Sequence, residues 1–193
     1  MSFLSRGKGS NKLLRWKAKD LHKGKLTKED AKFIFEQAEK QVKDSIETAA
    51  VIVSRTNTLL TVVAGLIIAI TAYIIKKWFE QNIFDDLLIS AVIGDTYLFT
   101  IGFLSVLNIQ PLRYDPVGSL PKDLLSDPFF HESIPDNERI IRYYVSESED
   151  YQVRIEKNNA KNSNRWKVYK LSLWAFLITP IIFALAYYLV TLL

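Results

Sequence analysis

One acidic residue stands inside an otherwise charge-free apolar stretch, and its chemistry is the first to consider. Asp95 is the only charged residue between positions 87 and 110. An ionised carboxylate in a hydrocarbon layer costs about 2.5–3.5 kcal/mol, so its side chain should face other helices or water. Its neighbours Gly94 and Thr96 would loosen the helix and admit water. Asp95 and Thr96 are therefore predicted to line a polar path for cations or protons. The alternative is that Asp95 stays protonated or pairs with Thr or Tyr hydroxyls.

Four arginines form a second group of candidate residues, Arg139, Arg142, Arg154 and Arg165. Together with Tyr143 and Tyr144 they are candidates for recognising an anionic ligand such as a nucleotide, through charge-assisted hydrogen bonds and stacking. However, residues 113–170 carry as many acids as bases, ten of each. An ordinary solvated helix surface is therefore the better-supported interpretation.

Other catalytic and metal-binding chemistry has no residues from which to start. The chain contains no cysteine, and its two histidines, His22 and His131, are far apart in polar sequence. No glycine-rich phosphate loop, paired-histidine motif, GxSxG elbow or protein-kinase signature is present. The sequence predicts no enzyme, no cofactor and no metal site.

The apolar residues are gathered in three blocks. Charged residues are absent from 56–75 and from 171–193, and the Asp95 block covers 87–110. Each block can cross a hydrocarbon core of about 30 Å as a helix. The predicted fold class is an all-α membrane protein with three transmembrane helices.

Two of these spans are predicted to continue as long helices outside the membrane. Thr27 and Asp30 can form a capping box with Asp in place of Glu, which starts a helix that should run to about Trp78. Its apolar stripe has the eleven-residue period of some coiled coils and includes Phe35, Val42 and Ile46.

The second long helix should run from about Asp136 to residue 193, with a break considered at residues 146–150. Its stripe includes Tyr151, Ile155, Asn158 and Asn162. The two asparagines either fix the register between the helices or are merely solvated.

Small residues occur at helix-packing spacing within the spans, Gly65 with Ala69 and Ser90 with Gly94. Such pairs allow close approach of helices and weakly favour a homo-oligomer.

Pro180 should kink the third span unless its neighbours compensate. Residues 111–135 are proline-rich and are expected to form an ordered loop or short helix.

The basic residues predict an orientation. Lysine and arginine number 13 before the first span, two in the 76–86 link and ten in 113–170. The positive-inside rule then places the N-terminus in the cytoplasm and the C-terminus outside. The basic segment 1–26 is expected to lie on anionic lipid. Its alternative is an organellar targeting segment, which would make the chain an organellar membrane subunit.

A resemblance follows from residues 27–193. A capped amphipathic helix leads into the first span through Ser54-Arg55-Thr56-Asn57-Thr58-Leu59-Leu60, and a Gly118/Pro121 loop precedes the run Tyr151…Ile155…Asn158…Asn162…Arg165…Tyr169. This architecture resembles the SLATT and Pycsar-type membrane effectors of bacterial anti-phage systems. The resemblance implies proteins that oligomerise in the inner membrane and disturb its integrity when a partner or second messenger signals infection. The chain departs from that pattern in having three spans and no recognisable sensor domain.

Two functional hypotheses result. The first is an oligomeric bacterial inner-membrane effector or pore, and the second is a membrane-anchored scaffold or regulatory subunit without conducting activity. A protein partner would dock on the cytoplasmic helices. A nucleotide signal has no support beyond the arginines.

Overall fold

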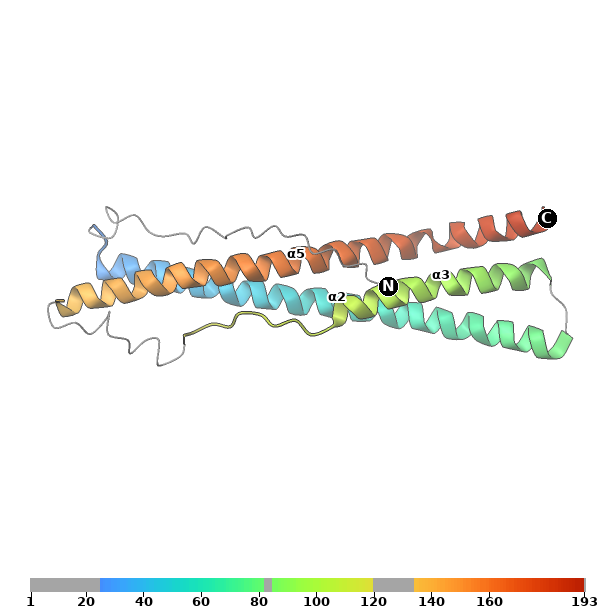
Figure 1. The fold of residues 1–193 in the computed structure, drawn as a ribbon, viewed down its shortest axis with the longest axis horizontal. Helices are drawn as coiled ribbons and strands as arrows, with labels where there is room; N and C mark the ends of the chain where they lie inside the picture. The colour runs from blue at the N-terminus through green and yellow to red at the C-terminus, as the bar shows by residue number, and fades with distance from the viewer. Residues whose placement is uncertain (1–24, 82–84, 120–133, 193) are drawn as a thin grey trace, which may run out of the picture. The chain divides into compact units, whose positions relative to one another are not determined.

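The computed structural model describes residues 25–81, 85–119 and 134–192, and within these ranges all regular secondary structure is helical. Three helices follow one another along the chain, α2 (Lys28–Gln81), α3 (Asp86–Ile109) and α5 (Asp136–Thr191) (Figure 1). Each is long and apolar enough to cross a membrane. The predicted fold class is therefore confirmed.

Some predictions fall on parts of the chain outside the described residues. These are most of the basic segment 1–26, the larger part of the proline-rich segment 111–135 and both histidines. The described start of that proline-rich segment, residues 111–119, has no helix and is mostly extended.

The break considered at residues 146–150 does not occur, because α5 is helical throughout that run. The polar side chains there have partners: Glu147 accepts a hydrogen bond from Ser119 (2.7 Å), and Ser148 donates to the carbonyl of Tyr144 (2.7 Å). Pro180 also lies inside α5 without ending it. Having no N–H, it leaves the carbonyl of Phe176 without a helical donor.

The start of α2 is fixed by the predicted capping box. The Asp30 N–H donates to Thr27 Oγ1 at 3.1 Å, and the Thr27 N–H donates back to Asp30 Oδ2 at 3.1 Å. The Thr27 hydroxyl also donates to Asp30 Oδ2 at 2.7 Å, and this bond, followed by that from the Thr27 N–H, holds the pKa of Asp30 below its ordinary value. The polar side chain stops the chain from continuing as helix toward its N-terminal side.

The start of α3 is capped by an acid that also forms an ion pair. Asp85 accepts from the Leu88 N–H at 2.7 Å and lies 3.0 Å from Lys77 Nζ. The Lys77 hydrogen bond, followed by the Leu88 N–H, lowers the pKa of Asp85. An ion pair therefore joins the C-terminal end of α2 to the N-terminal end of α3.

The chain forms two compact units. We call the first, with residues up to 46 and 114–159, the polar unit, and the second, with 47–113 and 160–193, the span unit. In the polar unit α2 packs on α5 through a buried core of Val42, Tyr151 and Ile155, with Phe35 and Ile46 against it. The Phe35 ring lies 5.5 Å from that of Tyr151. The two predicted stripes thus pair with each other within one chain.

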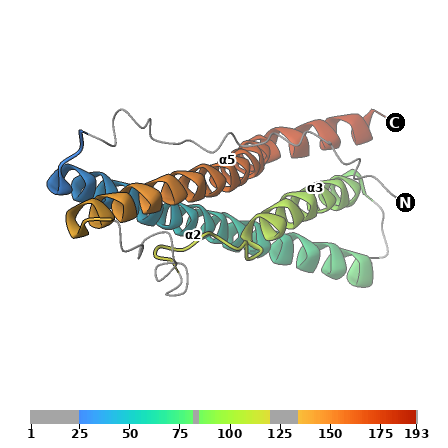
Figure 2. The ribbon, with the colours of Figure 1, turned by 60° about the vertical axis from the view of Figure 1, so that its left-hand side comes forward.

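The span unit contains α3 alongside the second half of α2, together with the last part of α5 (Figures 1 and 2). Its buried core is formed by four side chains, Leu59, Val63, Leu98 and Ile101. The two phenylalanines of α3 lie outside, with Phe99 56% and Phe103 63% exposed. Besides Leu88, Leu98 and Ile101, the buried face of α3 holds small and polar residues, namely Ser90, Gly94, Asp95, Gly102, Ser105 and Asn108. Exposed phenylalanines opposite a buried face that contains an acid, an asparagine and two serines suit a helix surrounded by lipid.

A glycine sets the distance between α3 and α5. A Cβ on Gly94 would lie 2.0 Å from Phe183 Cζ, so the ring occupies the space that a side chain would take. At Gly65 on α2, a Cβ would meet nothing within 4 Å. The two glycines therefore differ sharply in their tolerance of a methyl group.

We expect Gly94→Ala to lower the melting temperature of the detergent-purified protein by about 3–10 °C, because overpacking costs about 1–3 kcal/mol. Gly102→Ala, on the same helix, is the matched control, because a Cβ there would lie at an ordinary contact distance of 3.7 Å from Val63, and it should melt at about the wild-type temperature. Adding Phe183→Leu to Gly94→Ala should restore part of the loss. A Gly94→Ala protein that melts like the wild type would contradict this packing.

Candidate functional site

The centre of the candidate site is the carboxyl group of Asp95. This residue is 8% exposed and lies between helices of the span unit. Thr71 Oγ1 donates to Asp95 Oδ2 at 2.9 Å, while Oδ1 is buried without a hydrogen-bond partner among the described residues. Thr96, predicted to act with Asp95, is exposed and donates to the carbonyl of Val92 at 2.9 Å. The structure therefore separates these two residues and brings Thr71 to the carboxyl group instead.

One hydroxyl compensates only part of the cost of a carboxylate in a membrane. A hydrogen bond to a charged group contributes about 1.5–3 kcal/mol, against a cost of about 2.5–3.5 kcal/mol for burying the charge. No ion pair to Asp95 occurs in the described part of the chain. An unpaired carboxyl oxygen in this position can take up a proton or a small cation.

Further polar groups lie inside the span unit, toward the end at which α2 and α5 enter their charge-free runs. Asn108 Nδ2 donates to Thr56 Oγ1 at 3.0 Å, and both residues are buried. Ser172 is fully buried, and its Oγ has no partner among the described atoms. The Tyr97 hydroxyl donates to the carbonyl of Ala175 at 2.8 Å. Polar atoms thus occur at several levels of the bundle.

An apolar layer separates the two main polar pairs, Thr71–Asp95 and Thr56–Asn108. It is the buried core of Leu59, Val63, Leu98 and Ile101. Asp95 and Asn108 are about 20 Å apart along α3, at 1.5 Å per residue. Hydrophobic constrictions exclude water and ions. Within a single chain the polar levels are therefore not connected.

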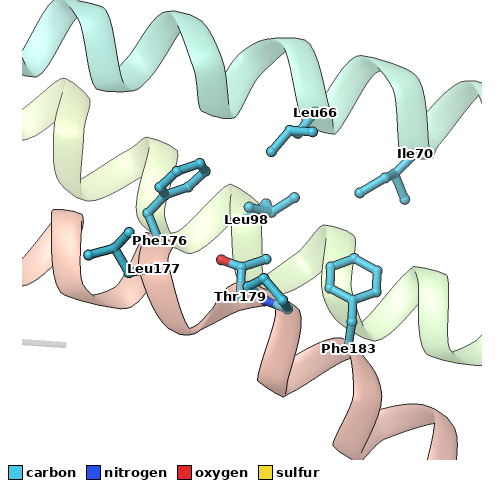
Figure 3. A pocket seen from close by; sticks show the side chains of 8 residues that line it. Leu66, Ile70, Leu98, Phe176, Leu177, Thr179 and Phe183 are labelled. Carbon is cyan, nitrogen blue, oxygen red and sulfur yellow. The ribbon is translucent and has the colours of Figure 1, made fainter.

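Beside this layer lies an apolar pocket of about 300 Å³ between the three helices. Figure 3 shows Leu98 between Leu66 and Ile70 on α2 and the side chains of Phe176, Thr179 and Phe183 on α5. The pocket is open to the outside of the helices, and its apolar lining favours lipid chains over water there. It gives Leu98 free volume into which to move.

In the polar unit, Asn158 holds both α2 and the chain that follows α3. Its Oδ1 accepts from the Asp115 N–H at 3.1 Å, and its Nδ2 donates to Ser45 Oγ at 3.1 Å and to the Asp115 carbonyl at 3.2 Å. Asn158 is fully buried, and Asn162, in the span unit, is 5% exposed. The alternative that these two asparagines are merely solvated is therefore wrong for both.

We call residues 115–119 the strap, because three more side chains of α5 hold it. Arg154 donates to the carbonyls of Pro116 (2.9 Å) and Gly118 (2.6 Å), and Tyr151 Oη accepts from the Gly118 N–H at 3.0 Å. Glu147 accepts from Ser119, as described above. Gly118 has a φ of 85°, a conformation that other residues rarely adopt.

The spacing of these α5 residues matches the strap. Glu147, Tyr151, Arg154 and Asn158 lie on one helix face and span about 16 Å, while the extended strap spans about 13 Å. Burial raises the pKa of the Tyr151 phenol above its ordinary value. The hydroxyl therefore remains neutral at physiological pH. The strap could not be predicted from the sequence, because the atoms that α5 holds are mostly backbone atoms, which do not depend on residue type.

The four arginines are not brought together. Arg139 lies 2.9 Å from Asp136, and Arg142 lies 2.6 Å from Glu138. Arg154 holds the strap, and Arg165 donates to the carbonyl of Gln110 in the span unit. An anionic ligand would have to displace these partners. Among the described residues, no group of three His, Cys, Asp or Glu could hold a metal ion.

The predicted small-residue pairs divide between two environments. Ser90 and Gly94 are buried on α3, where Ser90 donates to the carbonyl of Asp86 (2.6 Å). Gly65 and Ala69 lie on an exposed face of α2.

Thr71, Thr56 and Asn108 were not predicted from the sequence as members of the site. The 3–4 spacing of polar residues on α3 was the signal for Asn108.

No protein-family model matches the chain, and comparisons with curated proteins and with solved structures found no match either.

We expect Asn158→Ala to release the strap. The substitution removes two hydrogen bonds to Asp115 and one to Ser45, each worth about 0.5–1.5 kcal/mol. Hydrogen exchange of the Asp115 amide should therefore be at least about tenfold faster. The matched control is Asn159→Ala, which changes an exposed neighbour. Equal exchange rates in the two variants would contradict the role assigned to Asn158.

Proposed function

We propose that the chain is an effector of the bacterial inner membrane that assembles as a homo-oligomer and, once triggered, lets protons or small cations through. The observation that carries this proposal is the buried carboxyl group of Asp95, with one oxygen on Thr71 and the other without a partner. Ionisable residues inside a membrane commonly mark ion or proton pathways.

The arrangement around Asp95 corresponds to a resting state. The apolar layer closes the bundle between the two polar pairs, and the pocket beside Leu98 leaves room for the layer to move. Opening then requires Leu98 and its neighbours to shift so that water connects the polar levels. This sequence of events fits an effector that must remain closed until it is triggered.

Assembly and location rest on sequence features. Gly65 and Ala69 lie on an exposed face of α2, where another copy can approach closely. The distribution of basic residues favours a cytoplasmic N-terminus and an external C-terminus. The resemblance to anti-phage membrane effectors supports a defensive role, in which a partner or a second messenger supplies the trigger.

Expression of the wild-type chain in bacterial cells, with its native genomic neighbours, should depolarise the membrane, as measured with a voltage-sensitive dye. Asp95→Leu and Asp95→Asn should abolish the depolarisation, because neither side chain can carry the charge. Asp86→Asn makes the same change at an exposed residue of the first turn of α3 and should depolarise like the wild type. Full depolarisation by Asp95→Leu would refute the role of Asp95. No depolarisation by any form would refute the conducting assembly.

A second candidate function is a membrane-anchored scaffold, favoured by an open groove of about 410 Å³ in the polar unit. The groove lies between α2 and α5 and includes Phe33, which is 61% exposed, and Ile34. In this case Asp95→Asn would change nothing. Val42→Asp combined with Ile46→Asp, which disrupts the packing of the two helices, would abolish activity in the same cells.

A further inference from the structure

A cluster of cations and aromatic rings marks one end of the span unit. Arg55 lies with its guanidinium carbon 5.5 Å from the centre of the Trp166 ring, and Lys170 Nζ lies 5.6 Å from the same ring. The Tyr169 ring stacks on Trp166 at 5.3 Å. Among the described residues, neither cation has a carboxylate within ion-pair distance. Two positive charges therefore contact the same tryptophan ring, and no carboxylate of the described residues pairs with either.

The position of these cations along the chain places them at the surface of a bilayer. Arg55 immediately precedes the charge-free run 56–75, and Lys170 immediately precedes the charge-free run 171–193. Both helices enter their apolar runs at this end. A charged side chain just before a span lies at the level of the lipid headgroups, where tryptophan and tyrosine are also enriched.

An apolar groove leads away from the cations between α2 and α5. It has a volume of about 300 Å³ and begins at Arg55 and Thr58. It continues over Val62, Leu173 and Leu177. From Arg55 to Val62 the groove follows about 10 Å of helix. The groove thus has a polar mouth at Arg55, and the Lys170 ammonium lies near it, by the Trp166 ring that Arg55 also contacts.

We propose that this groove binds one anionic phospholipid, with the phosphate between Arg55 and Lys170 and part of an acyl chain along Val62 and Leu173. The charge of the mouth selects an anionic headgroup over a zwitterionic one, and the apolar floor selects a chain over a soluble anion. Basic pockets between membrane helices are known to recognise anionic headgroups. A helix of a second copy fits less well, because it would have to supply two acids at headgroup level.

The test is native mass spectrometry of the full-length chain purified in a non-ionic detergent. Phosphatidylglycerol and phosphatidylcholine with identical acyl chains are added at equal concentrations, and bound lipid is counted. The wild type should bind one phosphatidylglycerol in strong preference. Arg55→Gln with Lys170→Gln should weaken that binding about 25-fold, at about fivefold for each cation. Phosphatidylcholine binding should change little.

Two further variants separate the lipid site from general charge effects. Lys40→Gln with Lys157→Gln removes two exposed cations of the polar unit and should leave the preference intact. Val62→Trp fills the groove while keeping both cations, and it should weaken phosphatidylglycerol binding. Equal binding of the two lipids by the wild type would overturn the proposal. So would an unchanged preference in Val62→Trp, or full competition by inorganic phosphate, since either would leave no role for the acyl chain.

Discussion

Lipid offers no hydrogen bonds, and this constraint explains most of the architecture. Backbone groups in the spans must be satisfied within their own helices, with the Phe176 carbonyl opposite Pro180 as an exception, so the described residues form long helices and no strands. Many large apolar side chains lie on the outside of the span unit, and small and polar residues lie between the helices together with the apolar core. Against that background Asp95 stands out, since among the described residues its side chain has a single hydrogen-bond partner, the Thr71 hydroxyl.

The polar unit is stabilised by a small apolar core and by hydrogen bonds from polar side chains. Its core is a small cluster around Val42 and Tyr151, and polar side chains of α5 complete it by holding the strap. Asn158 is central here, because it binds the strap backbone and Ser45 on α2 at the same time. A trigger that acts on the polar unit would have these hydrogen bonds to exchange, whereas one that acts on the span unit would have mainly van der Waals contacts.

The sequence was informative wherever a local pattern has a single physical solution. Charge-free runs predicted the spans, the Thr27–Asp30 capping box predicted where α2 begins, and the stripe through Val42 predicted the face that packs on α5. Contacts between distant segments were not predictable in the same way. Thr71 is one of several hydroxyls in the first span, and nothing local distinguishes it. The strap is held through backbone atoms, which every residue possesses.

The most direct test is to measure whether residues 71 and 95 can be crosslinked within one chain. Because the chain has no cysteine, Thr71→Cys with Asp95→Cys can be treated in membranes with a short bifunctional thiol reagent. Thr71→Cys with Thr96→Cys serves as the control, since Thr96 faces outward. We expect efficient crosslinking within one chain for the first pair and little for the second. Equal crosslinking of both pairs, or crosslinks that form only between chains, would contradict the placement of Asp95 inside the bundle.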